Sequence, residues 1–169
     1  MARKTYYRPY RRTYGSKAHW ASNLRQGLLG QNGDVLCENA VQSQSVTPTP
    51  VILKCGNFKV QGDITVNVSN AGSVSVNVFL LYCPEGISTS MSGLEAAIQQ
   101  HPEWIMGWTS VDTPASGTGV AAGNRWSISS RLKRNLNSGD RIVIYTQGTG
   151  TATFTFGGAY TATFFTRAN

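Results

Sequence analysis

The sequence predicts an all-β protein, an eight-stranded jelly roll with one short helix in a connection, preceded by a basic N-terminal arm. Beyond about residue 33 the chain consists of Val, Ile, Thr, Ser, Phe and Gly in short runs separated by turn residues, which is typical of a sandwich or barrel. Only one segment carries helix signals, and the excess positive charge precedes the β runs. We therefore divide the chain into an arm with a flexible joint, residues 1–33, and a jelly-roll domain, residues 34–169.

The arm is defined by its charge. Residues 1–25 hold seven of the fifteen basic residues and no acid, whereas the other eight basic residues are balanced by eight acids in residues 26–169. The whole formal net charge of +7 therefore lies in the arm. Gly27, Gly30, Asn32 and Gly33 then predict a flexible joint. Such asymmetry indicates an acidic partner, either nucleic acid or an anionic membrane.

Tyrosines alternate with the arginines and lysines of the arm. Basic side chains neutralise phosphates, and aromatic rings stack on unpaired bases, so this composition suits single-stranded nucleic acid bound without sequence preference. We expect the arm to be disordered until it binds, because like charges crowd around Pro9. The predicted nucleic-acid-binding residues of the arm are Arg3, Lys4, Tyr6, Tyr7, Arg8, Tyr10, Arg11, Arg12, Tyr14, Lys17 and Arg25. A solvated tail, a nuclear-targeting signal and an organelle transit peptide are the alternatives.

The first half of the domain predicts strands at 38–46, 51–59, 64–68 and 73–83. The first is polar and ends at a Thr-Pro-Thr-Pro loop, and Gly62-Asp63 is expected to interrupt the chain between the second and third. The run 73–83 is the clearest strand, because Val74, Val76 and Val78 alternate with polar residues on one face.

One helix is expected at 94–100. Ser92 and Glu95 fit a capping box at its start, and the helix should stop before Pro102. Because this helix lies in a connection, we expect it to cover an open end of the sandwich.

The second half predicts strands at 104–111, 125–136, 141–147, 151–156 and 160–166. A Gly-, Ala- and Ser-rich loop separates the first two, a turn at 137–140 containing Asp140 precedes 141–147, and Gly157-Gly158 is expected to turn the chain before the last. In 125–136 the apolar face is expected to hold Trp126, Ile128, Leu132 and Leu136.

The polar face of 125–136 carries a second basic group, Arg125, Arg131 and Lys133, at strand spacing. It extends the predicted nucleic-acid site, or it serves as ordinary solubilising charge.

Catalysis has little support. Three widely spaced cysteines without a C-x-x-C pattern argue against a disulfide framework or zinc site and for a reducing compartment. The two histidines and eight acids form no recognisable catalytic arrangement. We therefore predict no enzyme activity, cofactor or metal site, although calcium bound by acids between subunits stays open. No apolar stretch is long enough to span a bilayer, so we expect no segment to cross a membrane. Between the two acidic partners we predict nucleic acid and not a membrane.

The layout resembles the capsid proteins of small viruses with circular single-stranded DNA genomes, of the circovirus and nanovirus kind. The resemblance rests on the Arg/Tyr arm through Arg12, on residues 78–84 (VFLLYCP) and on residues 130–144 (SRLKRNLNSGDRIVI). It implies that residues 34–169 form a shell domain and that about sixty identical copies close an icosahedral shell. It also implies that the arms lie inside on the genome and engage the host nuclear import machinery, which places the protein in the virion and, during assembly, in the host nucleus.

The genome is expected to be single-stranded DNA, although satellite plant viruses with single-stranded RNA share the same plan. The main alternative is a cellular single-stranded nucleic-acid-binding β-barrel protein, which should carry base-stacking aromatics on an exposed β face. A jelly-roll lectin or cytokine-like trimer is disfavoured, because it needs no basic arm. Nothing in the sequence identifies a host receptor.

Overall fold

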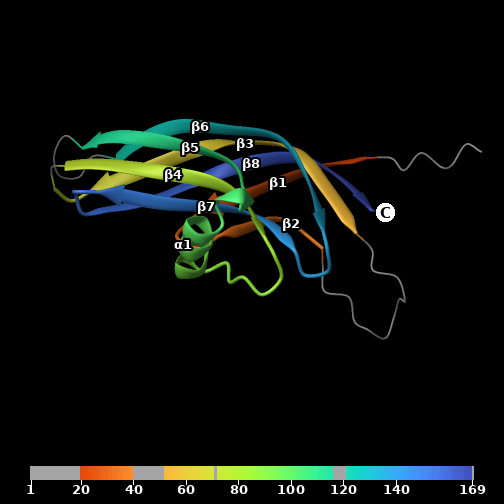
Figure 1. Ribbon diagram of the computed structural model, residues 1–169. Coiled ribbons are helices and arrows are strands. Elements are labelled where there is room, and N and C mark those ends of the chain that lie inside the picture. The colour runs from red at the N-terminus through yellow and green to blue at the C-terminus, as the bar shows by residue number, and fades with distance from the viewer. Residues whose placement is uncertain (1–19, 40–51, 71, 116–120, 169) are drawn as a thin grey trace, which may run out of the picture.

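The computed structural model describes residues 20–39, 52–70, 72–115 and 121–168 (Figure 1). These residues form eight strands, one α-helix and one short 3₁₀ turn, and the elements follow in this order: β1 Ala21–Leu29, β2 Asp34–Glu38, β3 Leu53–Val68, β4 Gly72–Cys83, α1 Met91–Gln100, η1 Pro102–Trp104, β5 Ile105–Ala115, β6 Ala121–Leu136, β7 Arg141–Gly150 and β8 Phe154–Ala168.

The strands form two four-stranded antiparallel sheets, with the orders β1-β8-β3-β6 and β2-β7-β4-β5. The pairs β1–β8, β2–β7, β3–β6 and β4–β5 are nested, so that the first strand pairs with the last and the two middle strands pair with each other. A long hairpin that is folded over itself in this way is a jelly roll. The predicted fold class is therefore confirmed.

The main core lies between the two sheets. Alternating residues of β3, among them Phe58, Val60 and Ile64, are buried against Val76 and Val78 of β4 and their neighbours. The Phe58 ring stacks on the ring of Phe164, with centroids 5.4 Å apart.

A second, smaller core lies under the helix. Leu94 of α1 packs against Leu81 of β4 and against Val143 and Tyr145 of β7, on the outer side of the β2-β7-β4-β5 sheet. The expectation that the helix covers an open end of the sandwich was wrong. Figure 1 shows α1 beside β7, and it covers outward side chains of β4 and β7 that are apolar.

The start of the helix also differs from the prediction. Ser90, not Ser92, is the N-cap, and its hydroxyl accepts a hydrogen bond from the backbone N–H of Gly93. The side chain of Glu95 does not cap the helix; its Oε1 accepts hydrogen bonds from the Tyr145 hydroxyl and from Gln147 Nε2, at 3.3 and 3.2 Å.

Residues 21–29, expected to belong to the arm and its joint, form strand β1 and pair along their whole length with β8. The sequence pattern hides this strand, because two of its three leucines lie on the outer face and a charged residue lies on the inner face. Leu24 and Leu28 point to solvent, while Arg25 and Gly27 lie on the inner face. Gly27 is required there, because a Cβ would collide with the Asp34 carboxylate and the Tyr160 hydroxyl. Residues 1–19 lie outside the described residues, so the division into arm and body stays a prediction.

Two predicted breaks are absent. Gly62 lies inside β3, paired with both Trp126 and Tyr160, and Gly158 lies inside β8, paired with Ile64. A Cβ at Gly62 would meet the carbonyl oxygen of Ala159, so these glycines permit close approach between strands and do not turn the chain. Strand β2 ends at Glu38, and the predicted strand at 38–46 stays untested beyond Asn39, because residues 40–51 lie outside the described residues.

The predicted inner face of β6 is correct except at Leu132. Ser130 continues the inner face after Trp126 and Ile128 and is buried, whereas Leu132 lies in a β-bulge opposite Asn57, which has a φ of 54°, and is 50% exposed. The Ser130 hydroxyl donates a 2.7 Å hydrogen bond to the carbonyl oxygen of Met106, which satisfies it inside the core.

A candidate nucleic-acid interface

The residues predicted to bind nucleic acid fall into three groups in the structure. The ten arm residues from Arg3 to Lys17 lie outside the described residues. Arg25 is on β1, where its Nη2 lies 3.0 Å from Oδ1 of Asp34. The other oxygen of Asp34 accepts a 2.7 Å hydrogen bond from the Tyr160 hydroxyl. Burial and this hydrogen bond raise the pKa of Tyr160. The charge of Arg25 is thus already balanced by a structural contact between β1, β2 and β8.

The third group, Arg125, Arg131 and Lys133, is exposed on the outer face of the β1-β8-β3-β6 sheet. The structure adds three cations that the sequence did not place there. Lys54 and Lys59 alternate with inward residues of β3, and Arg167 pairs with Lys54 across the β3–β8 ladder. The cations of this surface, called the basic face below, are Lys54, Lys59, Arg125, Arg131, Lys133 and Arg167.

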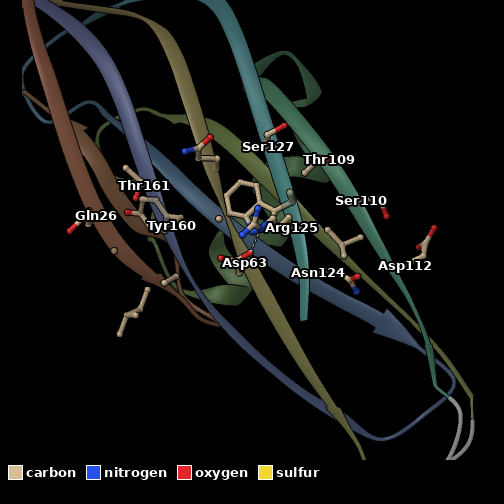
Figure 2. Close-up of a pocket in the computed structure, with 17 residues that line it drawn as sticks. Gln26, Asp63, Thr109, Ser110, Asp112, Asn124, Arg125, Ser127, Tyr160 and Thr161 are labelled. Carbon is tan, nitrogen blue, oxygen red and sulfur yellow. Dashed lines mark ion pairs between the residues drawn. The ribbon is translucent and has the colours of Figure 1, made fainter. Parts of the chain in front are cut away.

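Asp63 is the acid on the basic face. Its Oδ1 lies 3.5 Å from Nε of Arg125, an exposed ion pair that is marked by the dashed line in Figure 2. Within the described residues the other five cations of the face have no carboxylate within ion-pair distance.

The remaining charges of the described residues have the opposite balance. Seven acids stand there against only Arg25, Arg134 and Arg141, which gives a net charge of −4, whereas the six cations and one acid of the basic face give +5. Glu85, Glu95 and Glu103 lie along α1 and its connections. The body is nearly neutral in sum but strongly polarised between its two sheets, which the sequence count alone could not reveal.

An open hollow of about 1260 Å³ extends from the middle of the basic face to β5, the edge strand of the other sheet, and its charged lining residues are Asp63, Asp112 and Arg125. Figure 2 shows Gln26, Thr161 and Ser127 around it, from three different strands of the sheet. Their amide and hydroxyl groups donate and accept hydrogen bonds without adding charge. The hollow can therefore accommodate a polar chain, whereas the cations without a described carboxylate partner lie outside it.

Three cations without a carboxylate partner among the described residues, Lys54, Lys133 and Arg167, lie near the start of β1. Ala21 at the start of β1 pairs with Thr166, next to Arg167 and its partner Lys54. The Nζ atom of Lys133 lies 5.5 Å from the ring centroid of Trp20, the residue immediately before β1. Figure 1 shows the start of β1 and the end of β8 together at one end of the molecule. Trp20, the first described residue, therefore lies at this end of the basic face.

The described histidine and the three cysteines lie in the following surroundings. The His101 ring stacks on Trp104, and its Nδ1 lies 3.0 Å from Glu103 Oε1. No group of three or more histidine, cysteine or acidic side chains could hold a metal ion there. Cys37, Cys55 and Cys83 are buried free thiols, and burial raises the pKa of Cys83 to about 11. No described helix is long and apolar enough to cross a membrane.

No protein-family model and no curated protein matches the sequence. Solved viral structures do show distant likeness. Sacbrood virus of honeybee matches at 9% identity and a TM-score of 0.26, over 90% of this chain and 70% of the other. The Gx and Gt strains of infectious bursal disease virus match at 8% identity, with TM-scores of 0.24 and 0.27, over 88% and 91% of this chain. The chain spans only 31% and 38% of those two proteins. The assignment of the fold rests on the strand order and not on these likenesses.

Proposed function

We propose that the chain is the coat protein of a small virus, a structural protein that is not an enzyme. Identical copies assemble into a closed shell, and each copy holds single-stranded nucleic acid through the arm and the basic face. The observation that carries the proposal is the segregation of charge. Six cations lie in residues 1–19, and the basic face adds a net +5, while the rest of the described residues carries −4.

This segregation suits a shell wall better than a free-standing protein. A positive inner side is neutralised by packaged phosphate, and a mildly negative remainder keeps the outer surface soluble. At +7 per copy, about sixty copies would carry on the order of 400 positive charges, which must be offset by a polyanion for the shell to close.

We propose single-stranded DNA as the packaged genome, with the arm also engaging nuclear import machinery before assembly. This part of the proposal comes from the resemblance of residues 78–84 and 130–144 to circovirus-like capsids. It assigns the protein to the virion and, during assembly, to the host nucleus.

The test is electron microscopy of the purified full-length protein, combined with nuclease treatment. Uniform shells that contain nuclease-protected nucleic acid are expected. The sensitivity of the released nucleic acid to DNase or RNase identifies the genome. A monodisperse monomer or trimer, with or without added nucleic acid, would contradict the proposal.

One observation favours the second candidate, a cellular single-stranded nucleic-acid-binding protein. Two aromatic side chains, Trp20 and Phe165, are exposed beside the cations of the basic face. Such a protein would bind oligonucleotides without assembling, so the same microscopy separates the two candidates.

A further inference from the structure

Trp20 and Phe165 are the exposed aromatic side chains among the described residues of the basic face, which also carries the exposed Leu24 and Leu28. Each of the two aromatic residues is 38% exposed. Phe165 pairs with Ser22 of β1, which lies two residues after Trp20. The two rings therefore come from diagonal positions on neighbouring strands, roughly 7–8 Å apart in backbone terms. Successive nucleotides of an unstacked strand can match that spacing.

The cations stand next to these rings. On β3, the residue between Phe165 and Lys133 is Gly56, so no side chain separates the ring from the lysine. A Cβ at Gly56 would lie 2.6 Å from Cγ of Lys133, so the glycine lets the lysine lie close over β3. The Lys133 ammonium reaches the Trp20 ring, and Lys54 and Arg167 pair with each other on the adjoining row. Aromatic surface and positive charge thus alternate over one end of the sheet.

We propose that this end of the basic face binds unpaired nucleotides, with bases stacked on Trp20 and Phe165 and phosphates at Lys54, Lys133 and Arg167. The inference rests on the proposed binding of nucleic acid and adds its mode, which is selection of single strands over duplex. Bases in a duplex are already stacked on each other and cannot present their faces to a sheet, whereas unpaired bases can.

The contact between Lys133 and Trp20 does not obstruct this mode. The attraction of an exposed ammonium to a ring is weaker than the stacking of a base, and a phosphate beside the stacked base offers the ammonium a full negative charge. Lys133 can therefore move from the ring to the backbone when a strand binds.

An anionic membrane is the competing partner for a surface with aromatic rings and cations. Trp20 and Phe165 favour nucleic acid, because neighbours cover more than half of the surface of each residue, so neither ring can insert deeply into lipid. Leu24 and Leu28 of the same face are 68% and 76% exposed and are free to contact lipid. Vesicles with anionic lipid are therefore included in the test, and binding to them that depends on both rings would overturn the inference.

The test compares full-length protein with Trp20→Ala and Phe165→Ala, and with Trp20→Phe and Phe165→Tyr as conservative variants. Trp108→Ala is the matched control, because Trp108 is 61% exposed on the opposite sheet, where it stacks on Phe79. The probes are a short oligothymidylate, an abasic strand of the same length and a duplex of the same length. Binding is measured below the concentration of assembly and at about 0.5 M salt, where phosphate contacts are weakened.

For the oligothymidylate, each alanine variant should weaken binding roughly fivefold or more, while the conservative variants keep most of the affinity. Binding of the abasic strand and of the duplex should be unchanged, and Trp108→Ala should behave as wild type. An equal loss for thymidylate and abasic strands would overturn the stacking mode but leave the proposed function intact. The proposed function itself fails if neither the strand nor the duplex binds to the wild-type protein at any salt concentration. Unchanged thermal unfolding of the variants excludes a folding defect.

Discussion

Neutralising part of the basic face should weaken nucleic-acid binding by an amount that depends steeply on salt. The change is the triple variant Lys54→Gln, Lys59→Gln, Arg131→Gln, which leaves Lys133 and its contact with Trp20 in place. All three side chains lie on the outer face of the sheet without a carboxylate partner among the described residues. Their loss should therefore remove phosphate contacts without breaking structural ones.

The magnitude follows from counterion release. Each phosphate contact with a single strand contributes about −0.7 to the slope of log affinity against log salt concentration. Removing three contacts should make the slope about 2 less steep, so the loss should be roughly 100-fold at about 0.1 M salt and should vanish near 1 M.

The assay is titration of a labelled oligothymidylate at several salt concentrations. The control variant, Ser92→Asp, Gln99→Glu, Gln100→Glu, lowers the net charge by the same amount but places the change on exposed positions of α1. Its slope should match the wild type. If the control loses as much affinity as the basic-face variant, net charge and not the face determines binding, and the reasoning is refuted.

Three further predictions concern stability. In Asp140→Ala, the Tyr82 hydroxyl and the backbone N–H groups of Glu85 and Asn137 lose their acceptor. The free energy of unfolding, measured in urea, should therefore fall by about 3 kcal/mol. A change near zero would contradict the role assigned to this turn. Phe58→Ala should cost about 3–5 kcal/mol in the same assay, because the ring is fully buried, and a smaller loss would mean that the core collapses around the gap. Burial and the hydrogen bond to Asp140 raise the pKa of Tyr82 from 10.0 to about 12. The neutral form of Tyr82 therefore stabilises the fold fully below pH 10, and this stabilisation is lost as the pH rises from 10 to about 12. Tyr82→Phe should reduce this alkaline loss, and equal losses in both proteins would show that other groups cause it.

The sequence predicted those parts of the fold in which side-chain alternation is regular. The strand at 73–83 matches β4 closely, and the turn before β7 contains Asp140 as expected. Strand β1 was missed because Leu24 and Leu28 face solvent and its inner face carries Arg25, so the pattern resembles a polar tail. The sequence predicts chain breaks at Gly62 and Gly158, but both residues lie inside strands. A sequence does not distinguish a glycine that turns the chain from one that lets strands approach each other.

The candidate site was predicted only in part for a different reason. Arg131 and Lys133 could be placed on one face because they share a strand. Lys54 and Arg167 are far apart in the sequence and meet only because β8 pairs with β3, which alternation within a strand cannot show. The polarisation of the body follows from the same long-range pairing, so a count of charges along the chain gave near neutrality where the structure has two unlike sheets.

The most direct test of the whole account is a reconstruction of particles assembled from the full chain with nucleic acid. The account predicts a closed shell in which the outer face of the β1-β8-β3-β6 sheet and Trp20 contact the density of the nucleic acid, while α1 points away from it. A shell with α1 and the β2-β7-β4-β5 sheet toward the nucleic acid would contradict the account.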